Sequence, residues 1–380
     1  MKILSVFGTR PEAIKMAPVI KALADVEGFD SRVCVTAQHR EMLDQALEIF
    51  EIRPDFDLDL MRENQTLPDI MGKALSGISK IFEQWRPDIA LIQGDTITTM
   101  AASMAAYFAR ISVGHVEAGL RTGDKYAPWP EEINRRVTAT IADLHFAPTE
   151  IAAENLAREG IPRERIHVTG NTVIDALREV KKKIRNDDKI RNEMEARFSF
   201  LDPAKKLILV TGHRRENFGD GFENICEAIA ELSERADAQI VYPAHLNPHV
   251  QEPVNRVLKN RKNIFLMEPL SYLPFVYLMD RSYIILTDSG GVQEEAPALG
   301  KPVLVMREST ERPEAVAAGT SRLVGADKKR IVAEANRLLD DPTERESMAK
   351  AANPYGEGDA AAKIANILID AAKRKKDGHK

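Results

Sequence analysis

The sequence contains only two cysteines among 380 residues, and both lie in segments with an apolar pattern. Cys34 is part of SRVCVTA and Cys226 is part of FENICEAIAEL, where small buried thiols are common, so we expect structural roles for both. The chain also lacks an apolar stretch long enough to span a bilayer, and its first residues lead directly into KILSVFG without a signal-peptide pattern. These absences predict a cytoplasmic protein.

Neither sign of charge dominates, because 53 basic and 58 acidic side chains give a formal net charge of -5. Such a chain has no overall attraction for nucleic acid or for an anionic membrane, so any phosphate-bearing ligand must be held by a local cluster of donors. The three spaced glycines of the dinucleotide fingerprint are missing. His245 and His249 are four residues apart, but Asn247-Pro248 between them disfavours the helix of a metal-ligand pair. We therefore expect neither a redox cofactor nor a metal.

Short β-branched runs alternate with longer amphipathic segments along the chain, a pattern typical of βαβ units. The expected strands are KILSVF, SRVCVTA, DIALIQG, SVGHVEA and LHFAPT in the first half, and LILVTG, QIVYPAH, NIFLME, YIILTD and PVLVM in the second. Each set predicts a parallel sheet with helices on both faces. Since 380 residues exceed the size of one hydrophobic core, the fold class is α/β with two doubly wound, Rossmann-like domains.

We expect residues 1–170 to form the first domain and residues 171–358 to form the second. A charged stretch from Lys181 to Lys206 lacks strand character and is interpreted as the connection between them. A closing helix over about 359–380 is expected to pack back on the first domain. In open α/β sheets ligands bind beyond the carboxyl ends of the strands, so the loops at those ends are the candidates for a site.

Two of these loops have features of anion-binding turns. The first strand ends in Gly8-Thr9-Arg10-Pro11-Glu12, where the glycine would let a ligand approach and the helix dipole favours an anion beside Arg10; an ordinary capped turn is the alternative. The later loop, Asp288-Ser289-Gly290-Gly291, opens a helix with backbone N–H groups suited to a diphosphate. Glu295, about one turn into that helix, would accept hydrogen bonds from ribose hydroxyls. We therefore predict a phosphate site at the second loop.

Three carboxylates follow strands of the first half. Asp95 comes after DIALIQG, Glu117 after SVGHVE, and Glu131 lies in APWPEEINRR. Together at one sheet edge they indicate acid/base chemistry, because close carboxylates push each other's pKa values apart. Taken singly, Asp95 is equally well a helix cap and Glu131 an ion-pair partner of Arg135.

One histidine occupies a comparable position in the second half. His213 follows LILVTG in the sequence GHRREN, directly before a pair of arginines. By the same loop rule it should face the cleft between the domains, although a structural histidine remains the alternative.

A series of motifs runs through the whole chain: FGTRPEAIKMAP, VTAQHREMLDQ, GDTITT, GHVEAGLRTGD, PWPEEINRR, GNTVIDAL, VTGHRREN, YPAHLNP, YLPFVYLM, TDSGGVQEEAPALGKPVLVMRESTERPEA and NPYGEGDA. In content and order this series resembles the non-hydrolysing UDP-N-acetylglucosamine 2-epimerases of the enterobacterial common antigen type. The resemblance implies a fold similar to the GT-B glycosyltransferases with the active site in the cleft, reversible conversion of UDP-N-acetylglucosamine to UDP-N-acetylmannosamine, no cofactor, and a homodimer.

The resemblance also implies roles for individual residues. The catalytic positions are Asp95, Glu117, Glu131 and His213. The substrate-binding positions are Arg10, Lys15, Phe275, Ser289, Gly290, Gly291, Glu295 and Arg312. Similar bacterial members are activated by a second UDP-N-acetylglucosamine, and the matching positions are Gln38, Arg214 and His245. Glu41 and Asn64 stand where members of the family differ, which makes activation less certain than catalysis.

Inverting C2 of the sugar requires removal of a proton from a carbon with no neighbouring carbonyl. If UDP leaves first, positive charge developing at C1 acidifies the C2–H bond, and a carboxylate takes the proton to give 2-acetamidoglucal; UDP then adds back with protonation on the other face. The alternatives are a GT-B glycosyltransferase, a hydrolysing epimerase and a non-enzymatic UDP-sugar sensor. The carboxylates and the order of the motifs favour the non-hydrolysing epimerase.

Overall fold

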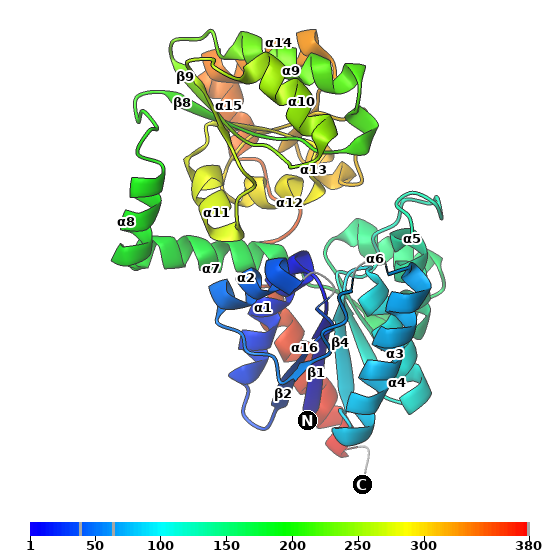
Figure 1. The fold of residues 1–380 in the computed structure, drawn as a ribbon. Helices are drawn as coiled ribbons and strands as arrows, with labels where there is room; N and C mark the ends of the chain where they lie inside the picture. Colours follow the sequence, from blue (N-terminus) through cyan, green and yellow to red (C-terminus); the bar gives the residue numbers. More distant parts are fainter. Residues whose placement is uncertain (38–39, 63–64, 378–380) are drawn as a thin grey trace. The chain divides into compact units, whose positions relative to one another are not determined.

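The computed structural model describes residues 1–37, 40–62 and 65–377. The chain forms two compact units: unit 1 comprises Met1–Ala176 and Tyr355–Lys380, and unit 2 comprises Leu177–Pro354. Each unit contains its own parallel sheet, covered by helices on both faces (Figure 1). The boundary between the units falls inside helix α7 (Thr172–Asn186).

Unit 1 is built on a seven-stranded sheet with the order β3-β2-β1-β4-β5-β6-β7. Within the described residues every pairing in this sheet is parallel. The strand order reverses direction between β1 and β4, which makes these neighbours the switch point of the sheet. The strands are β1 (Lys2–Phe7), β2 (Asp30–Val35), β3 (Phe56–Asp57), β4 (Ile89–Gln93), β5 (Ser112–Val116), β6 (Leu144–Ala147) and β7 (Ile166–Val168).

Helices cover both faces of the unit 1 sheet. One group packs together as α1, α2 and α16, and the other as α3, α4 and α5. The strands between them are almost wholly buried and apolar, as a parallel sheet covered on both sides requires. The helices are α1 (Arg10–Ala24), α2 (Arg40–Phe50), α3 (Leu67–Gln84), α4 (Ile97–Ala109), α5 (Glu131–Ile141), α6 (Glu150–Arg158), the short 3₁₀ helix η1 (Arg163–Arg165) and α16 (Ala360–Asp377).

The C-terminal helix α16 is tied to unit 1 at its first turn. The carboxylate of Asp175 accepts hydrogen bonds from the backbone N–H groups of Ala360 at 3.3 Å and Ala361 at 3.0 Å. Just before this turn, the N–H of Asn171 donates to the carbonyl of Tyr355 at 2.8 Å. A chain that has left unit 1 at α7 therefore returns to it through a side-chain cap on α16.

Unit 2 repeats the plan with a six-stranded parallel sheet of order β10-β9-β8-β11-β12-β13. Its switch point lies between β8 and β11. The strands are β8 (Lys206–Thr211), β9 (Ala238–Pro243), β10 (Ile264–Met267), β11 (Ile284–Thr287), β12 (Val303–Val305) and β13 (Ser321–Leu323). The helices are α8 (Asp188–Arg197), η2 (Arg215–Asn217), α9 (Asp220–Leu232), α10 (Pro248–Leu258), α11 (Tyr272–Arg281), α12 (Gly290–Ala298), α13 (Pro313–Ala317), α14 (Lys328–Asp340) and α15 (Pro342–Ala349).

The prediction of two Rossmann-like sheets is confirmed, and each predicted strand is present. Three short strands, β3, β7 and β13, escaped prediction because two or three residues are too few to show an alternating pattern. The charged stretch interpreted as a connection contains the end of α7 and the whole of α8. Phe198, directly after α8, stacks on Tyr277 of α11 with ring centroids 5.4 Å apart, so this stretch packs within unit 2.

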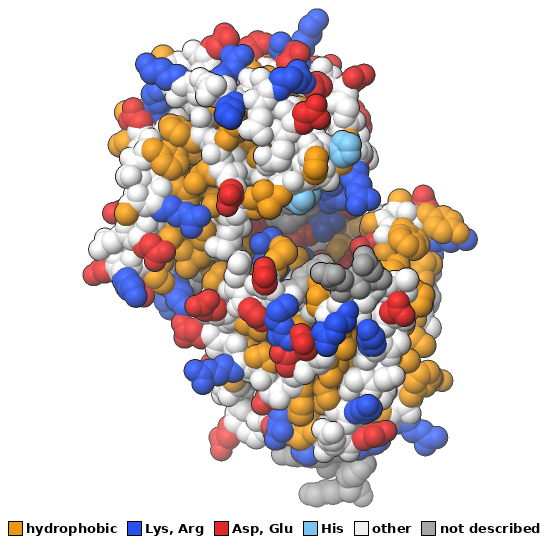
Figure 2. Space-filling view, in the orientation of Figure 1, with side chains coloured by type: hydrophobic (Ala, Val, Ile, Leu, Met, Phe, Trp, Pro, Cys, Tyr) orange, Lys and Arg blue, Asp and Glu red, His pale blue; other side chains and the backbone are white. Residues whose placement is uncertain are grey.

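The surface carries charges of both signs. In Figure 2 basic and acidic side chains are interspersed over the visible face of each unit, as the small net charge implies. In the part of the chain that the structure describes, no helix combines the length and the apolar character needed to cross a membrane.

Candidate active site

The predicted residues of unit 1 gather at the switch point of its sheet. Arg10 begins the helix after β1, Asp95 follows β4, and Glu117 follows β5. The ends of β4 and β5 are joined, because the N–H of Gly94 donates to the carbonyl of Val116 at 3.0 Å. Parallel topology thus brings residues from distant parts of the sequence to one edge of one sheet.

Glu117 has an unusual backbone and a tightly bound side chain. Its φ of 63° lies in the left-handed region, which a non-glycine residue rarely adopts and which often marks a functional site. One carboxylate oxygen, Oε2, lies 2.5 Å from Nζ of Lys15 and accepts a 2.6 Å hydrogen bond from the Gln93 side chain. Lys15 and Glu117, both predicted site residues, therefore form an ion pair that fixes the direction of the carboxylate.

Asp95 is held by helix α5. Its carboxylate pairs with the guanidinium of Arg135, and its carbonyl accepts a 2.8 Å hydrogen bond from the Asn134 side chain. The cap of α4 is the next residue, Thr96, whose hydroxyl accepts from the N–H of Thr99 at 3.3 Å. The interpretation of Asp95 as a simple helix cap is therefore wrong.

Glu131 differs from the other two carboxylates. It is the first residue of α5, and its Oε2 is buried without a hydrogen-bond partner among the described residues. Arg135, the expected ion-pair partner, contacts Asp95 and lies 3.5 Å from Glu132 instead. One oxygen of Glu131 is therefore a buried acceptor whose hydrogen-bonding capacity the described residues do not use.

The turn after β1 is already filled by a carboxylate of the chain itself. Glu12, only 2% exposed, accepts hydrogen bonds from the N–H groups of Gly8 at 3.0 Å and Thr9 at 2.8 Å. The helix N-terminus beside Arg10 is thus neutralised internally. Gly8 is needed for a different reason than ligand approach: a Cβ there would lie 2.2 Å from Oγ1 of Thr36. The ordinary capped turn that the sequence offered as the alternative is therefore confirmed.

His213 lies at the switch point of unit 2. It follows β8, while Asp288 follows the neighbouring strand β11, and the two strands are in register at Thr211 and Thr287. Oδ2 of the fully buried Asp288 accepts from the N–H groups of His213 and Arg214, both at 2.8 Å. The other oxygen, Oδ1, lies 3.4 Å from Nδ1 of His213. Asp288 thus holds the backbone of His213 and places a carboxylate oxygen beside its ring.

The electrostatic surroundings of His213 favour its neutral form. Burial lowers the pKa of His213, the carboxylate of Asp288 opposes this, and Arg214 and His245 lower the pKa further. The ring of His245 stacks on that of His213 with centroids 5.6 Å apart and an interplanar angle of 20°. Nδ1 of His245 accepts from the N–H of Asn247 at 3.1 Å, so this ring also caps the turn that follows β9.

Two arginines surround the N-terminus of α12. A Cβ placed on Gly290 would lie 3.6 Å from Cζ and Nη2 of Arg312 and 3.8 Å from Nη2 of Arg214. Ser289, the residue before the helix, makes no side-chain capping bond, and its own N–H donates to Oγ1 of Thr287 at 3.0 Å. In contrast to α1, which Glu12 caps, this N-terminus has two guanidinium groups beside it and no side-chain capping bond from Ser289, an arrangement that favours an anion.

The remaining predicted residues of unit 2 lie on or next to α11 and α12. Arg312 donates through Nε to Oε1 of the buried Glu294 at 2.5 Å, which fixes the guanidinium. Glu295 is 8% exposed, and burial together with this carboxylate raises the pKa of Tyr272 well above its usual value. Phe275 is partly buried on α11. Gln38 and Asn64 lie outside the described residues.

Several residues that support the site were missed from the sequence. The spacing Thr9-Pro11-Glu12 is a capping-box signal that identifies Glu12 as a local acceptor. Asp288 was recognised only as part of a turn and Arg135 only as a partner of Glu131, while Gln93 and Glu294 gave no local signal. In residues 1–37, 40–62 and 65–377 no group of three or more His, Cys, Asp or Glu side chains is arranged to hold a metal ion.

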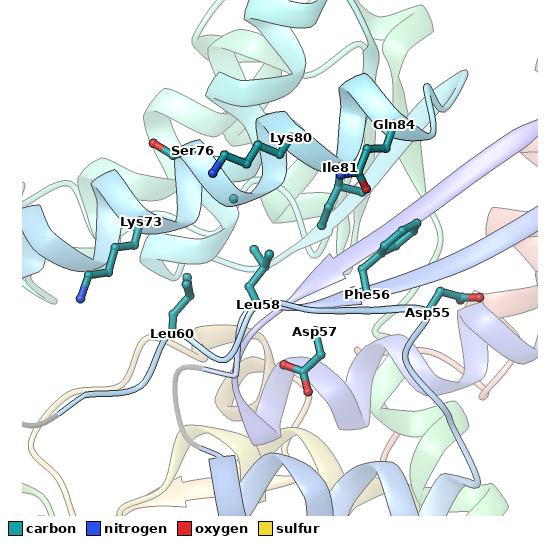
Figure 3. Close-up of a pocket in the computed structure, with 11 residues that line it drawn as sticks. Asp55, Phe56, Asp57, Leu58, Leu60, Lys73, Ser76, Lys80, Ile81 and Gln84 are labelled. Atoms are coloured by element: carbon teal, nitrogen blue, oxygen red, sulfur yellow. The ribbon is translucent and has the colours of Figure 1, made fainter.

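A pocket elsewhere in unit 1 contains none of the predicted residues. It lies between the β3 segment and α3, where Leu58 and Leu60 point towards the helix and Asp57 points away from it (Figure 3). Gly77 of α3 allows this packing, since a Cβ there would come within 2.8 Å of Leu58. The candidate functional residues of each unit therefore lie at its own switch point and not in this pocket.

Fold and site together define an α/β enzyme class with two Rossmann-like units: carboxylates line the sheet edge of one, and two arginines lie beside the N-terminus of α12 in the other. A family model described as UDP-N-acetylglucosamine 2-epimerase matches residues 21–369, and the chain belongs to this family. It is 58% identical to the UDP-N-acetylglucosamine 2-epimerase of Escherichia coli (strain K12) over 97% of this chain and 98% of that one. The Yersinia pestis enzyme of the same name is 59% identical over the same shares.

A solved structure shows the same fold. The UDP-GlcNAc 2-epimerase from Neisseria meningitidis, crystallised with UDP-GlcNAc bound, superposes with a TM-score of 0.91 at 52% identity, covering 97% of this chain and 100% of that one. The family match supports the predicted epimerase and not the glycosyltransferase considered as the alternative.

Proposed function

We propose that this protein catalyses the reversible C2 epimerisation of UDP-N-acetylglucosamine to UDP-N-acetylmannosamine, by elimination and re-addition of UDP through 2-acetamidoglucal. The observation that carries the proposal is the match of almost the whole chain to the epimerase family, with residues 21–369 covered. Residues from both switch points act in this one reaction: those of unit 1 on the sugar and those of unit 2 on the diphosphate.

Glu131 is the carboxylate that we assign to proton transfer. Glu117 is held by Lys15 and Gln93, and Asp95 is paired with Arg135, so both are engaged by donors of the protein. Oε2 of Glu131 makes no hydrogen bond among the described residues. A base must reach the proton it removes, which favours the carboxylate with an unengaged oxygen. Asp95 and Glu117 would then stabilise positive charge developing at C1.

The leaving diphosphate is proposed to bind at the N-terminus of α12. Support comes from the contrast between two helix starts: α1 is capped by Glu12, whereas α12 has no side-chain cap and two guanidinium groups near Gly290. A preorganised donor aimed at developing charge is worth about 3 kcal/mol of transition-state stabilisation. Arg312 and the backbone of Gly290 and Gly291 would supply such donors, with His213 nearby in the same unit.

Incubation with UDP-N-acetylglucosamine in deuterated water tests the reaction directly. Epimerisation by elimination places deuterium at C2 of the UDP-N-acetylmannosamine product, visible by NMR, and needs neither NAD nor a divalent metal. A hydrolysing enzyme would release UDP and free N-acetylmannosamine, a glycosyltransferase would require an acceptor, and a sensor would leave the substrate unchanged. Retention of protium at C2, or loss of activity with a chelator, contradicts the proposal.

A second UDP-N-acetylglucosamine is proposed as an activator that contacts Arg214 and His245. The stacking of His245 on His213 supports this proposal, because a ligand that moves the ring of His245 also changes the packing of the His213 ring.

We further propose a homodimer, which sedimentation equilibrium would test, and a cytoplasmic location. Both cysteines are buried free thiols, a state that a reducing compartment maintains.

A further inference from the structure

Glu12 is a buried carboxylate that the proposed mechanism does not use. It is 2% exposed and lies in the first turn of α1, two residues after Arg10. Burial raises the pKa of Glu12, while hydrogen bonds from Thr96, Gly8 and Thr9 oppose the rise. A buried carboxyl group is costly unless donors surround it, so the hydrogen bonds that Glu12 accepts decide where this side chain can lie.

The two oxygens of Glu12 contact different parts of unit 1. Oε2 accepts from the N–H groups of Gly8 at 3.0 Å and Thr9 at 2.8 Å and from the hydroxyl of Thr9 at 2.8 Å. Oε1 accepts from the hydroxyl of Thr96 at 2.7 Å and lies 3.2 Å from that of Thr99. The first set closes the turn after β1, and the second set reaches the turn after β4.

Capping of α1 accounts for only half of these contacts. A capping box needs Oε2 and the residues of its own turn, as in the box of Thr66 and Asp69 that begins α3. The contacts of Oε1 are made to residues 84 and 87 positions away, at the start of another helix. They contribute nothing to the cap of α1, so they serve to connect the two turns.

The connection reaches the three segments that carry predicted site residues after β1, β4 and β5. Arg10 follows Thr9 directly, and Asp95 precedes Thr96. The hydroxyl of Thr99 donates to the carbonyl of Gln93 at 2.6 Å, and the Gln93 side chain donates to Glu117 at 2.6 Å. Because a hydroxyl has one hydrogen, Thr99 is bound firmly to Gln93 and only loosely to Glu12.

From this geometry we infer that Glu12 is a positioning residue, which fixes Arg10 and Asp95 relative to each other by joining their two turns. This inference rests on the proposed epimerisation for its kinetic consequence but not for its structural one. Geometry and not charge is the requirement: in Glu12→Gln the amide oxygen accepts from Gly8 and Thr9, while the amide NH₂ donates to the hydroxyl oxygens of Thr96 and Thr99.

The hydrogen bonds that Glu12 accepts from Thr96 and Thr99 are called the bridge below. Four variants at Glu12 and Thr96, and one control, test the inference. Glu12→Ala and Thr96→Val remove the bridge, and each should lower kcat by about a hundredfold, the effect of a displacement of about 1 Å in a catalytic group. Glu12→Gln and Thr96→Ser keep it and should retain most of kcat. Affinity for UDP, which the proposal assigns to α12, should stay within about threefold of wild type in all four. Asp69→Ala breaks the capping box of α3 without touching the bridge and should leave kcat unchanged.

Hydrogen–deuterium exchange supplies a readout that does not depend on activity. Glu12→Ala should speed exchange in peptides covering residues 8–14 and 93–100, because both turns lose their shared partner. Faster exchange in 8–14 alone means that Glu12 is only a cap and overturns the inference. The inference is also overturned if Glu12→Ala or Thr96→Val is folded and has the same kcat as an active wild-type enzyme. An inactive wild type would instead contradict the proposed function, and the exchange result would still decide the bridge.

Discussion

The imidazole rings of His213 and His245 stack on each other with centroids 5.6 Å apart, although their side chains follow different strands, β8 and β9. The sequence predicts separate roles for them, catalysis for His213 and activator binding for His245. Direct contact can couple the activator site to the catalytic site, because movement of either ring changes the packing of the other.

We predict that His245→Ala weakens activation while leaving the catalytic carboxylates in place. For wild type, the forward reaction should be sigmoidal in UDP-N-acetylglucosamine, and the reverse reaction should be slow until a trace of that nucleotide sugar is added. Steady-state kinetics in both directions measure this. His249→Ala is the matched control, since His249 stacks on Phe218 at 5.2 Å instead of on His213, and should keep the activation. Hyperbolic wild-type kinetics in both directions would rule out the activator site.

The contact between Asp288 and His213 leads to a second prediction. Asp288→Asn preserves an oxygen for the two backbone N–H groups but removes the negative charge near Nδ1. Since that charge favours the imidazolium form, the already lowered pKa of His213 should fall further. NMR titration of the His213 ring, assigned with His213→Asn, measures the shift, and turnover should drop by at least about tenfold. An unchanged pKa would show that Asp288 acts only on the backbone.

The catalytic groups themselves are tested by near-isosteric changes. Asp95→Asn, Glu117→Gln, Glu131→Gln and His213→Asn should each lower turnover by at least about a hundredfold, because each removes an acid, a base or a charge from the reaction centre. Circular dichroism checks that the variants stay folded. Glu83→Gln, an exposed change near the end of α3, is the control. Any residue whose variant keeps near-normal turnover leaves the catalytic set.

Gly290 offers a test of the diphosphate site. An added methyl group would meet Arg312 at 3.6 Å and Arg214 at 3.8 Å, ordinary contact distances, so Gly290→Ala should fold. The methyl group would nevertheless occupy the space between the guanidinium groups and the helix N-terminus, and we expect UDP to bind at least about tenfold more weakly. Isothermal titration calorimetry measures the affinity. In Gly72→Ala the same change in a helix meets no atom within 4 Å and should have no effect on UDP binding. Equal affinities in the two variants place the diphosphate elsewhere.

The buried histidines under the edge of unit 1 predict an acid-sensitive stability. Burial lowers the pKa of His115 to about 3 and that of His145 to about 4, and the two residues are paired in register on β5 and β6. Between these values and about 6.5 the unfolded chain binds more protons than the folded one, so stability is complete above about pH 6.5 and falls with decreasing pH. Each histidine contributes a slope of up to about 1.4 kcal/mol per pH unit.

Tryptophan fluorescence during urea unfolding reports on this unit alone, because Trp85 and Trp129 both belong to unit 1. His145→Leu, of similar volume and without a titrating group, should reduce the difference in unfolding free energy between pH 7 and pH 5. An identical pH dependence in wild type and variant would contradict the assignment to His145.

The sequence by itself determined the local structure and the kinds of chemistry. Alternating apolar runs gave the long strands, and glycine, serine and carboxylate residues after those strands gave the candidates for anion binding and proton transfer. A capping-box spacing even marks Glu12. These features depend on neighbouring residues, whose interactions are set by helix and strand geometry and can be derived from spacing.

Only the tertiary structure decided which candidates act together. Periodicity does not encode the order of parallel strands, so the switch points between β1 and β4 and between β8 and β11 could not be derived from it. The contacts of Asp95 with Arg135, of Asp288 with His213 and of Glu12 with Thr96 join residues 40, 75 and 84 positions apart. Such pairings exist because folding brings distant strand ends to one edge, and at that edge a carboxylate that caps its own helix can also hold its neighbour in place.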